Sequence, residues 1–79
     1  MKLARVIRTG GTWVLAKPYS IVDKPPIGTI VQYKLAVSRG YDVYFPGVCG
    51  FAWVFDTTFD WYFEDLDSET TVLHDSCAS

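Results

Sequence analysis

Three short runs of alternating bulky residues constrain the fold of this chain more than any other feature. The runs cover residues 41–45, 51–55 and 59–63, and each has an aromatic or branched apolar side chain at every second position. The dipeptide Pro46-Gly47 marks a turn between the first two runs. Because successive side chains of a β-strand point to opposite faces, a period of two predicts three antiparallel strands in a meander. We therefore expect an all-β protein.

Residues 59–66 also fit a second interpretation. Phe59, Tyr62, Phe63 and Leu66 lie three or four positions apart, which is the spacing of side chains on one face of a helix. We expect a strand over this segment, since the period of two continues the meander. The alternative is a helix within this segment, and its favoured form is one short turn around Glu64 to Leu66.

The remaining segments predict further strands joined by loops. Residues 2–8 predict a first strand, residues 12–16 a second strand or an ordered loop wall, and residues 29–35 a strand rich in β-branched side chains. Residues 17–28 predict a long structured loop, because three prolines there lack the N–H group that a strand ladder needs. Residues 70–73 could add a closing strand, and residues 75–79 predict a disordered tail. The expected core is Val6, Val31, Val43, Phe45, Trp53, Phe55, Trp61, Phe63 and Leu66.

The length of 79 residues predicts a single domain, residues 1–79, with one small core. Aromatic residues make up 16% of the chain, and we expect them to supply most of the buried apolar area. No stretch approaches the roughly 20 apolar residues of a membrane-spanning helix. We expect a soluble protein without membrane contact, located in the cytoplasm, of the host cell if the protein is viral.

Charge is strongly segregated along the chain. Residues 1–39 contain seven basic residues and one acidic residue, a formal charge of +6. Residues 40–79 contain eight acidic residues and no Lys or Arg, a formal charge of −8. Opposite fields on two segments can steer a charged partner, or they can hold the two halves of one molecule together. Two copies could also dock through these surfaces, so both a monomer and a homodimer are open.

Four short segments resemble a known family. They read PIGTIV at residues 26–31, YDVYFPG at 41–47, WYF at 61–63 and Leu66-Asp67. Over about residues 26–67 the chain resembles small Src-homology-3-like (SH3-like) barrels, in particular short KOW-like and phage-encoded proteins of that type. The resemblance implies an SH3-like antiparallel barrel of five to six strands, and it implies architecture rather than activity. It also suggests a phage or mobile-element accessory protein.

The sequence offers little for catalysis, metals or cofactors. The only histidine, His74, lies near the end of the chain, and apolar residues surround Cys49, so a structural thiol is expected there. Cys77 could pair with Cys49 only if the tail folded back, and we expect both to be reduced. The carboxylates lack the spacing and central glycine of a calcium loop. We expect no enzyme, no cofactor and no metal site.

Two binding hypotheses remain. The first is a non-enzymatic protein-interaction module that binds and inhibits a host protein through an acidic and aromatic surface, formed by Asp56, Asp60, Tyr62, Glu64, Asp65, Tyr41 and Tyr44. The alternative is a nucleic-acid-binding barrel that uses a basic patch of Arg5, Arg8, Lys17, Lys24, Lys34 and Arg39. A third possibility is that the basic first strands simply neutralise the acidic last strands as neighbours.

Overall fold

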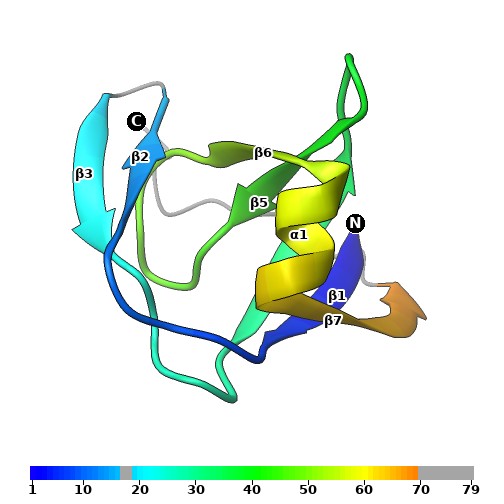
Figure 1. Cartoon of the computed structure of the whole chain (residues 1–79). Coiled ribbons are helices and arrows are strands. Elements are labelled where there is room, and N and C mark those ends of the chain that lie inside the picture. Colours follow the sequence, from blue (N-terminus) through cyan, green and yellow to red (C-terminus); the bar gives the residue numbers. More distant parts are fainter. Residues whose placement is uncertain (17–18, 70–79) are drawn as a thin grey trace.

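The structure, a computed structural model, describes residues 1–16 and 19–69, with side chains described as far as residue 66. It is an all-β fold with one short helix among these residues, so the predicted fold class is confirmed (Figure 1). The described residues form seven strands, five of them in the main sheet. The elements are β1 (Lys2–Val6), β2 (Thr12–Leu15), β3 (Ser20–Asp23), β4 (Ile30–Leu35), β5 (Gly40–Tyr44), β6 (Ala52–Phe55), α1 (Asp56–Tyr62) and β7 (Phe63–Glu69).

Five of the strands form one antiparallel sheet in the order β6-β5-β4-β1-β7. The first and last strands of the described chain therefore lie side by side, as Figure 1 shows for β1 and β7. Helix α1 connects β6 at one edge of the sheet to β7 at the other, which gives the fold a barrel-like form. Strands β2 and β3 form a separate hairpin beside the sheet.

The core lies between the inner face of the sheet, the hairpin and α1. Val6, Val31, Val43, Phe45 and Phe63 are buried as predicted. Aromatic rings pack closely there, with the Phe59 and Tyr33 centroids 4.6 Å apart. The other buried side chains, which the prediction did not include, are Ala4, Leu15, Tyr33, Ala52, Val54 and Phe59.

Strand β6 faces the opposite way from the prediction. Trp53 and Phe55 were expected in the core, but Phe55 is 56% exposed, and Ala52 and Val54 are buried instead. The reason is the register with β5, which sets Ala52 opposite the buried Val43, and directly paired residues share a face of the sheet. In β6 the small side chains of Ala52 and Val54 therefore face the core, and the rings of Trp53 and Phe55 lie on the outer face.

The close approach of Trp53 to Gly40 fixes the outer face at this point. A Cβ atom on Gly40 would lie 2.3 Å from the Trp53 indole, so only glycine fits beneath the ring. The indole N–H donates a hydrogen bond of 3.3 Å to the carbonyl of Val37 in the β4–β5 turn. That turn contains two non-glycine residues with positive φ, Ser38 and Arg39.

The strand predicted over residues 59–63 is wrong, because α1 occupies Asp56–Tyr62 and β7 begins at Phe63. The helical spacing of Phe59 and Tyr62 prevails over the period of two. Phe59 is 3% exposed, whereas Trp61, on the opposite side of the helix, is 58% exposed. Trp61 is therefore not a core residue, and Leu66 is only partly buried.

The loop predicted over residues 17–28 contains β3, which the prolines do not interrupt. Pro25 and Pro26 follow the end of the strand, and Val22 packs against the core. The strand predicted over 70–73 and the tail over 75–79 lie outside the described residues. No helix in the described part of the chain has the length and apolar character needed to cross a membrane.

Candidate functional site

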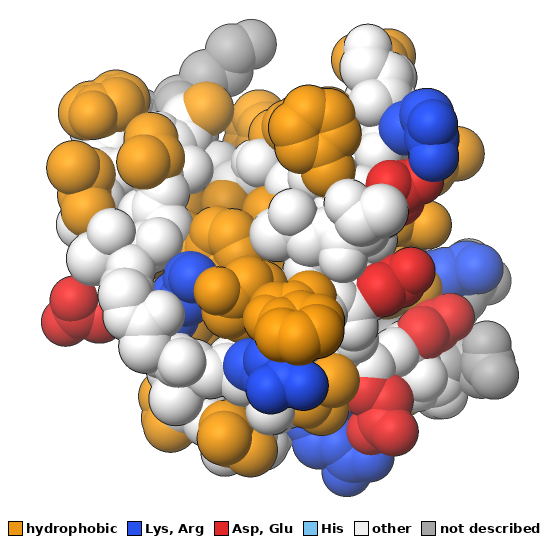
Figure 2. All heavy atoms as spheres, viewed as in Figure 1, with side chains coloured by type: hydrophobic (Ala, Val, Ile, Leu, Met, Phe, Trp, Pro, Cys, Tyr) orange, Lys and Arg blue, Asp and Glu red, His pale blue; other side chains and the backbone are white. Residues whose placement is uncertain are grey.

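An acidic edge runs along α1 and β7. It consists of Asp56 and Asp60, one turn apart on the helix, and of Glu64 on β7. Arg39 forms an ion pair of 3.5 Å with Asp56. The Arg5 guanidinium donates to Glu64, with an Nε to Oε1 distance of 3.1 Å. Figure 2 shows the acidic side chains along the edge where α1 and β7 lie, with basic side chains beside them.

Pairing with arginine reduces the charge that this edge presents. Of its three carboxylates, only Asp60 has no ion pair with a side chain that the structure describes. Exposed ion pairs contribute little to stability, and both members remain in contact with water. Two arginine charges beside three carboxylates leave one negative charge in excess along the edge, so the possibility that basic residues neutralise acidic ones holds in part.

The other residues of the predicted acidic and aromatic surface lie elsewhere. Tyr44 is on the outer face of the sheet, where its ring is 5.6 Å from that of Phe51. Tyr62 packs edge-on against Trp13 of the hairpin at 5.3 Å. Tyr41 and Asp65 line a pocket at the end of the barrel near β1. The seven predicted residues therefore do not form one surface.

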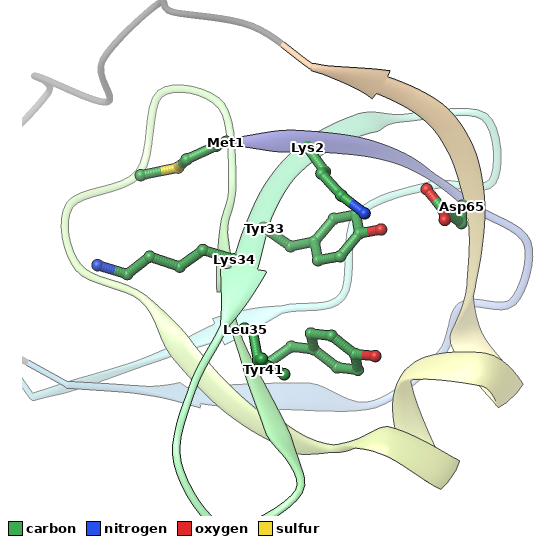
Figure 3. Close-up of a pocket in the computed structure, with 7 residues that line it drawn as sticks. All are labelled: Met1, Lys2, Tyr33, Lys34, Leu35, Tyr41 and Asp65. Atoms are coloured by element: carbon green, nitrogen blue, oxygen red, sulfur yellow. The ribbon is translucent and has the colours of Figure 1, made fainter.

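The pocket beside Tyr41 has a volume of about 520 Å³. Figure 3 shows the Lys2 ammonium directed between the Tyr33 hydroxyl and the Asp65 carboxylate, with Lys34 pointing away from both tyrosines. Its lining has two lysine ammonium groups, one carboxylate and two phenols, with no imidazole, thiol or serine hydroxyl. A nucleophile with an adjacent base is therefore absent from its described lining.

The basic residues are also dispersed. Arg5 and Arg39 pair with the acidic edge, and Lys34 lies 5.9 Å from the ring centroid of Tyr44 on the outer face. Lys17 lies outside the described residues. Only Arg8 and Lys24 are close to the same group of side chains, near the C-terminal end of α1. A continuous basic patch over all six predicted residues is not formed by the described ones.

Arg8 and Lys24 both lie over aromatic rings. Arg8 Cζ is 4.0 Å from the ring centroid of Trp61. Lys24 Nζ is 3.9 Å from the centroid of Tyr62 and 4.5 Å from that of Trp13. Cations are attracted to ring faces by the ring quadrupole. Figure 2 shows basic side chains directly against hydrophobic ones between the hairpin and α1.

Trp61 and Tyr62 border a cavity of about 410 Å³, which we call the cation–aromatic cleft. Three segments form it, the chain after β1, the β3–β4 loop and the end of α1. Its lining combines polar groups with exposed apolar side chains, and Ile27 is 64% exposed. The cleft is lined by Ile7, Arg8, Thr9, Ile27, Trp61 and Tyr62.

Hydrogen bonds hold the three segments of the cleft together. The Ile7 N–H donates to the Tyr62 carbonyl at 2.9 Å, which ties the end of β1 to the end of α1. The Thr9 hydroxyl donates to the Pro25 carbonyl at 2.8 Å. The Lys24 N–H donates to the Gly11 carbonyl at 3.0 Å, which joins the β3–β4 loop to the β1–β2 loop. The cleft is a fixed feature of the fold.

The sequence prediction missed the role of Trp61 because it assigned this residue to the core. The helical spacing of Phe59 and Tyr62 could have identified this role. If these two residues share the buried face of a helix, then Trp61 must lie on the other side. Ile7 and Ile27 carried no signal, since isolated apolar residues in loops are common.

The prediction of a reduced thiol at Cys49 is wrong, because Cys49 is disulfide-bonded. The sequence has one other cysteine, Cys77, which lies outside the described residues, as does His74. No cluster of three or more His, Cys, Asp or Glu side chains that could hold a metal ion occurs among the described residues.

Comparison with known proteins gives no relative for this chain. No protein-family model, no curated protein and no solved structure matches it.

Proposed function

We propose that this chain is a non-enzymatic protein-interaction module that binds its partner through the cation–aromatic cleft. The observation that carries the proposal is Trp61, a tryptophan that is 58% exposed beside a cavity instead of being buried in a core that is otherwise rich in rings. Exposed aromatic anchors next to cationic groups are typical of the energetic centre of protein interfaces.

The acidic edge is the weaker candidate for the partner surface, because two of its three carboxylates already have arginine partners. The nucleic-acid alternative also has less support, because only two of the five described members of the predicted basic patch, Arg8 and Lys24, lie close together. That the chain is a phage or mobile-element accessory protein acting on a host protein stays a prediction from the resemblance. A cytoplasmic location also stays a prediction, and a disulfide at Cys49 is more typical of oxidising compartments.

Affinity purification from cells that encode the chain tests this function. The immobilised chain is compared with Trp61→Ala, with Asp60→Asn from the acidic edge, and with Leu35→Ala, an exposed apolar residue outside the cleft. We expect the main co-purifying protein to be lost with Trp61→Ala and retained with the other two. If the partner is lost with Asp60→Asn and retained with Trp61→Ala, the acidic edge is the binding surface instead.

A further inference from the structure

The two cations at the cation–aromatic cleft, Arg8 and Lys24, differ from the two arginines beside the acidic edge. Arg5 and Arg39 each have a carboxylate partner. Neither Arg8 nor Lys24 forms an ion pair with any side chain that the structure describes. Both are held on ring faces instead, which fixes their positions without neutralising their charge.

A guanidinium that covers an indole can still bind an anion. Its face contacts the ring, while its N–H groups lie in its own plane and point outward. Arg8 is exposed, so these donors are open to solvent. A carboxylate approaching in that plane would accept charge-assisted hydrogen bonds, which are among the strongest that a surface can offer.

Exposed apolar side chains lie among the polar groups that line the cleft. Ile7 and Ile27 are both exposed large aliphatic side chains, and together with Trp61 they border the cavity of about 410 Å³. An apolar side chain entering the cavity would remove these surfaces from water. The ligand that fits therefore combines an apolar anchor with flanking negative charge.

A peptide segment fits this description better than a nucleic acid does. Single-stranded nucleic acids need open ring faces for base stacking and a series of cations along the backbone. Here Arg8 and Lys24 already cover faces of the rings.

The cleft is also prepared for binding. The hydrogen bonds from Ile7, Thr9 and Lys24 already join its three segments, so little ordering is needed when a ligand enters. Binding sites that are ordered in advance lose less entropy on association.

We infer that the cation–aromatic cleft binds an acidic peptide segment with a central apolar anchor, which is inserted among Ile7, Ile27 and Trp61 while its carboxylates reach Arg8 and Lys24. This inference rests on the proposed function and names the chemistry of the partner.

Fluorescence anisotropy with labelled, blocked peptides tests it. One peptide has a central Leu-Phe pair flanked by two glutamates on each side, and two others replace these glutamates with glutamines or lysines. We expect the glutamate peptide to bind at least about tenfold more tightly than the glutamine peptide, the ratio that one charge-assisted hydrogen bond provides. We also expect its affinity to fall as salt is raised.

The matched variants are Arg8→Met and Arg39→Met. Each removes one exposed guanidinium, and Met in place of Arg8 keeps an apolar chain over Trp61. We expect Arg8→Met to remove the preference for the glutamate peptide and Arg39→Met to retain it. Both variants should remain folded by circular dichroism, and the lost contact with Trp61 should lower the unfolding midpoint of Arg8→Met only slightly.

Equal binding of all three peptides, or no binding of any, would overturn the inference. Tighter binding of a labelled oligothymidine would overturn it too and would favour nucleic acid. The co-purification test with Trp61→Ala is independent of these peptides. If Trp61→Ala loses the partner but no acidic peptide binds, the chain is a protein-interaction module whose cleft binds a different kind of segment.

Discussion

The ammonium of Lys24 lies 3.9 Å from the centroid of the Tyr62 ring, and this contact joins the β3–β4 loop to the last residue of α1. The same ammonium lies 4.5 Å from the ring of Trp13 on the hairpin. Three separate parts of the chain therefore meet at one positive charge. This contact therefore both stabilises the fold and holds the segments beside the cleft in place.

Replacing Lys24 with Met removes this charge and retains an apolar chain of similar length. We expect the free energy of unfolding to fall by about 0.5–2 kcal/mol, the usual contribution of a cation over an aromatic ring. Urea denaturation measures the change. Lys34→Met is the control, because its ammonium lies 5.9 Å from the Tyr44 ring and should contribute less. If both variants lose the same free energy of unfolding, the two ring contacts of Lys24 contribute no more than the longer contact of Lys34.

Phe59→Ala and Trp61→Ala distinguish the helix from the strand that alternation predicts. In a strand both rings would face the core, whereas in α1 Phe59 is 3% exposed and Trp61 58%. We expect Phe59→Ala to cost about 3–5 kcal/mol, enough to unfold a domain of this size. Trp61→Ala should cost less than about 1 kcal/mol, as for other surface substitutions. Thermal unfolding followed by circular dichroism measures both, and comparable losses would contradict the helix.

Gly40→Ala tests the packing of Trp53 on the outer face of the sheet. The added Cβ would lie 2.3 Å from the indole, so the ring must move. We expect a cost of about 1–3 kcal/mol, typical of overpacking. In a Trp53→Ala background the same substitution should cost much less, because the obstructing ring is gone. A double-mutant cycle by chemical denaturation measures this coupling, and additive effects would contradict the contact.

Cys49 should not react as a thiol. Iodoacetamide added in concentrated guanidinium chloride without reductant should leave Cys49 unmodified, and prior reduction should make it reactive, because it is disulfide-bonded. Peptide mass spectrometry measures the labelling. Reduction should also lower the stability of the folded protein by about 2–4 kcal/mol, the usual contribution of a disulfide in a small domain. Labelling of Cys49 without reductant would contradict the bond.

Alternation in the sequence identified most strands but not the face that each strand buries. Residues 51–55 alternate in both directions, with rings at odd positions and Ala52 and Val54 at even ones. The choice depends on the pairing of Ala52 with Val43. This pairing with another strand is not a local property of the segment. Phe59 satisfies both a period of two and a helical period, so only its packing against Tyr33 decides.

The site was harder to predict than the fold. Charge segregation correctly indicated opposite charges on the two halves, and the structure brings Arg5 to Glu64 because β1 and β7 are neighbours. The contact of Arg8 with Trp61 could not be inferred in the same way. It requires that β1 end beside the end of α1, which follows from the whole sheet order.

Nuclear magnetic resonance mapping tests the central claim most directly. The chain is labelled with nitrogen-15 and titrated with the glutamate-flanked Leu-Phe peptide, and the backbone and indole resonances are followed. We predict that the largest shifts occur at the Trp61 indole N–H and at the amides of Arg8 and Ile27, with Asp60 and Leu35 little affected. Shifts centred on the acidic edge or on the outer face of β6, with an unchanged Trp61 indole, would contradict the account.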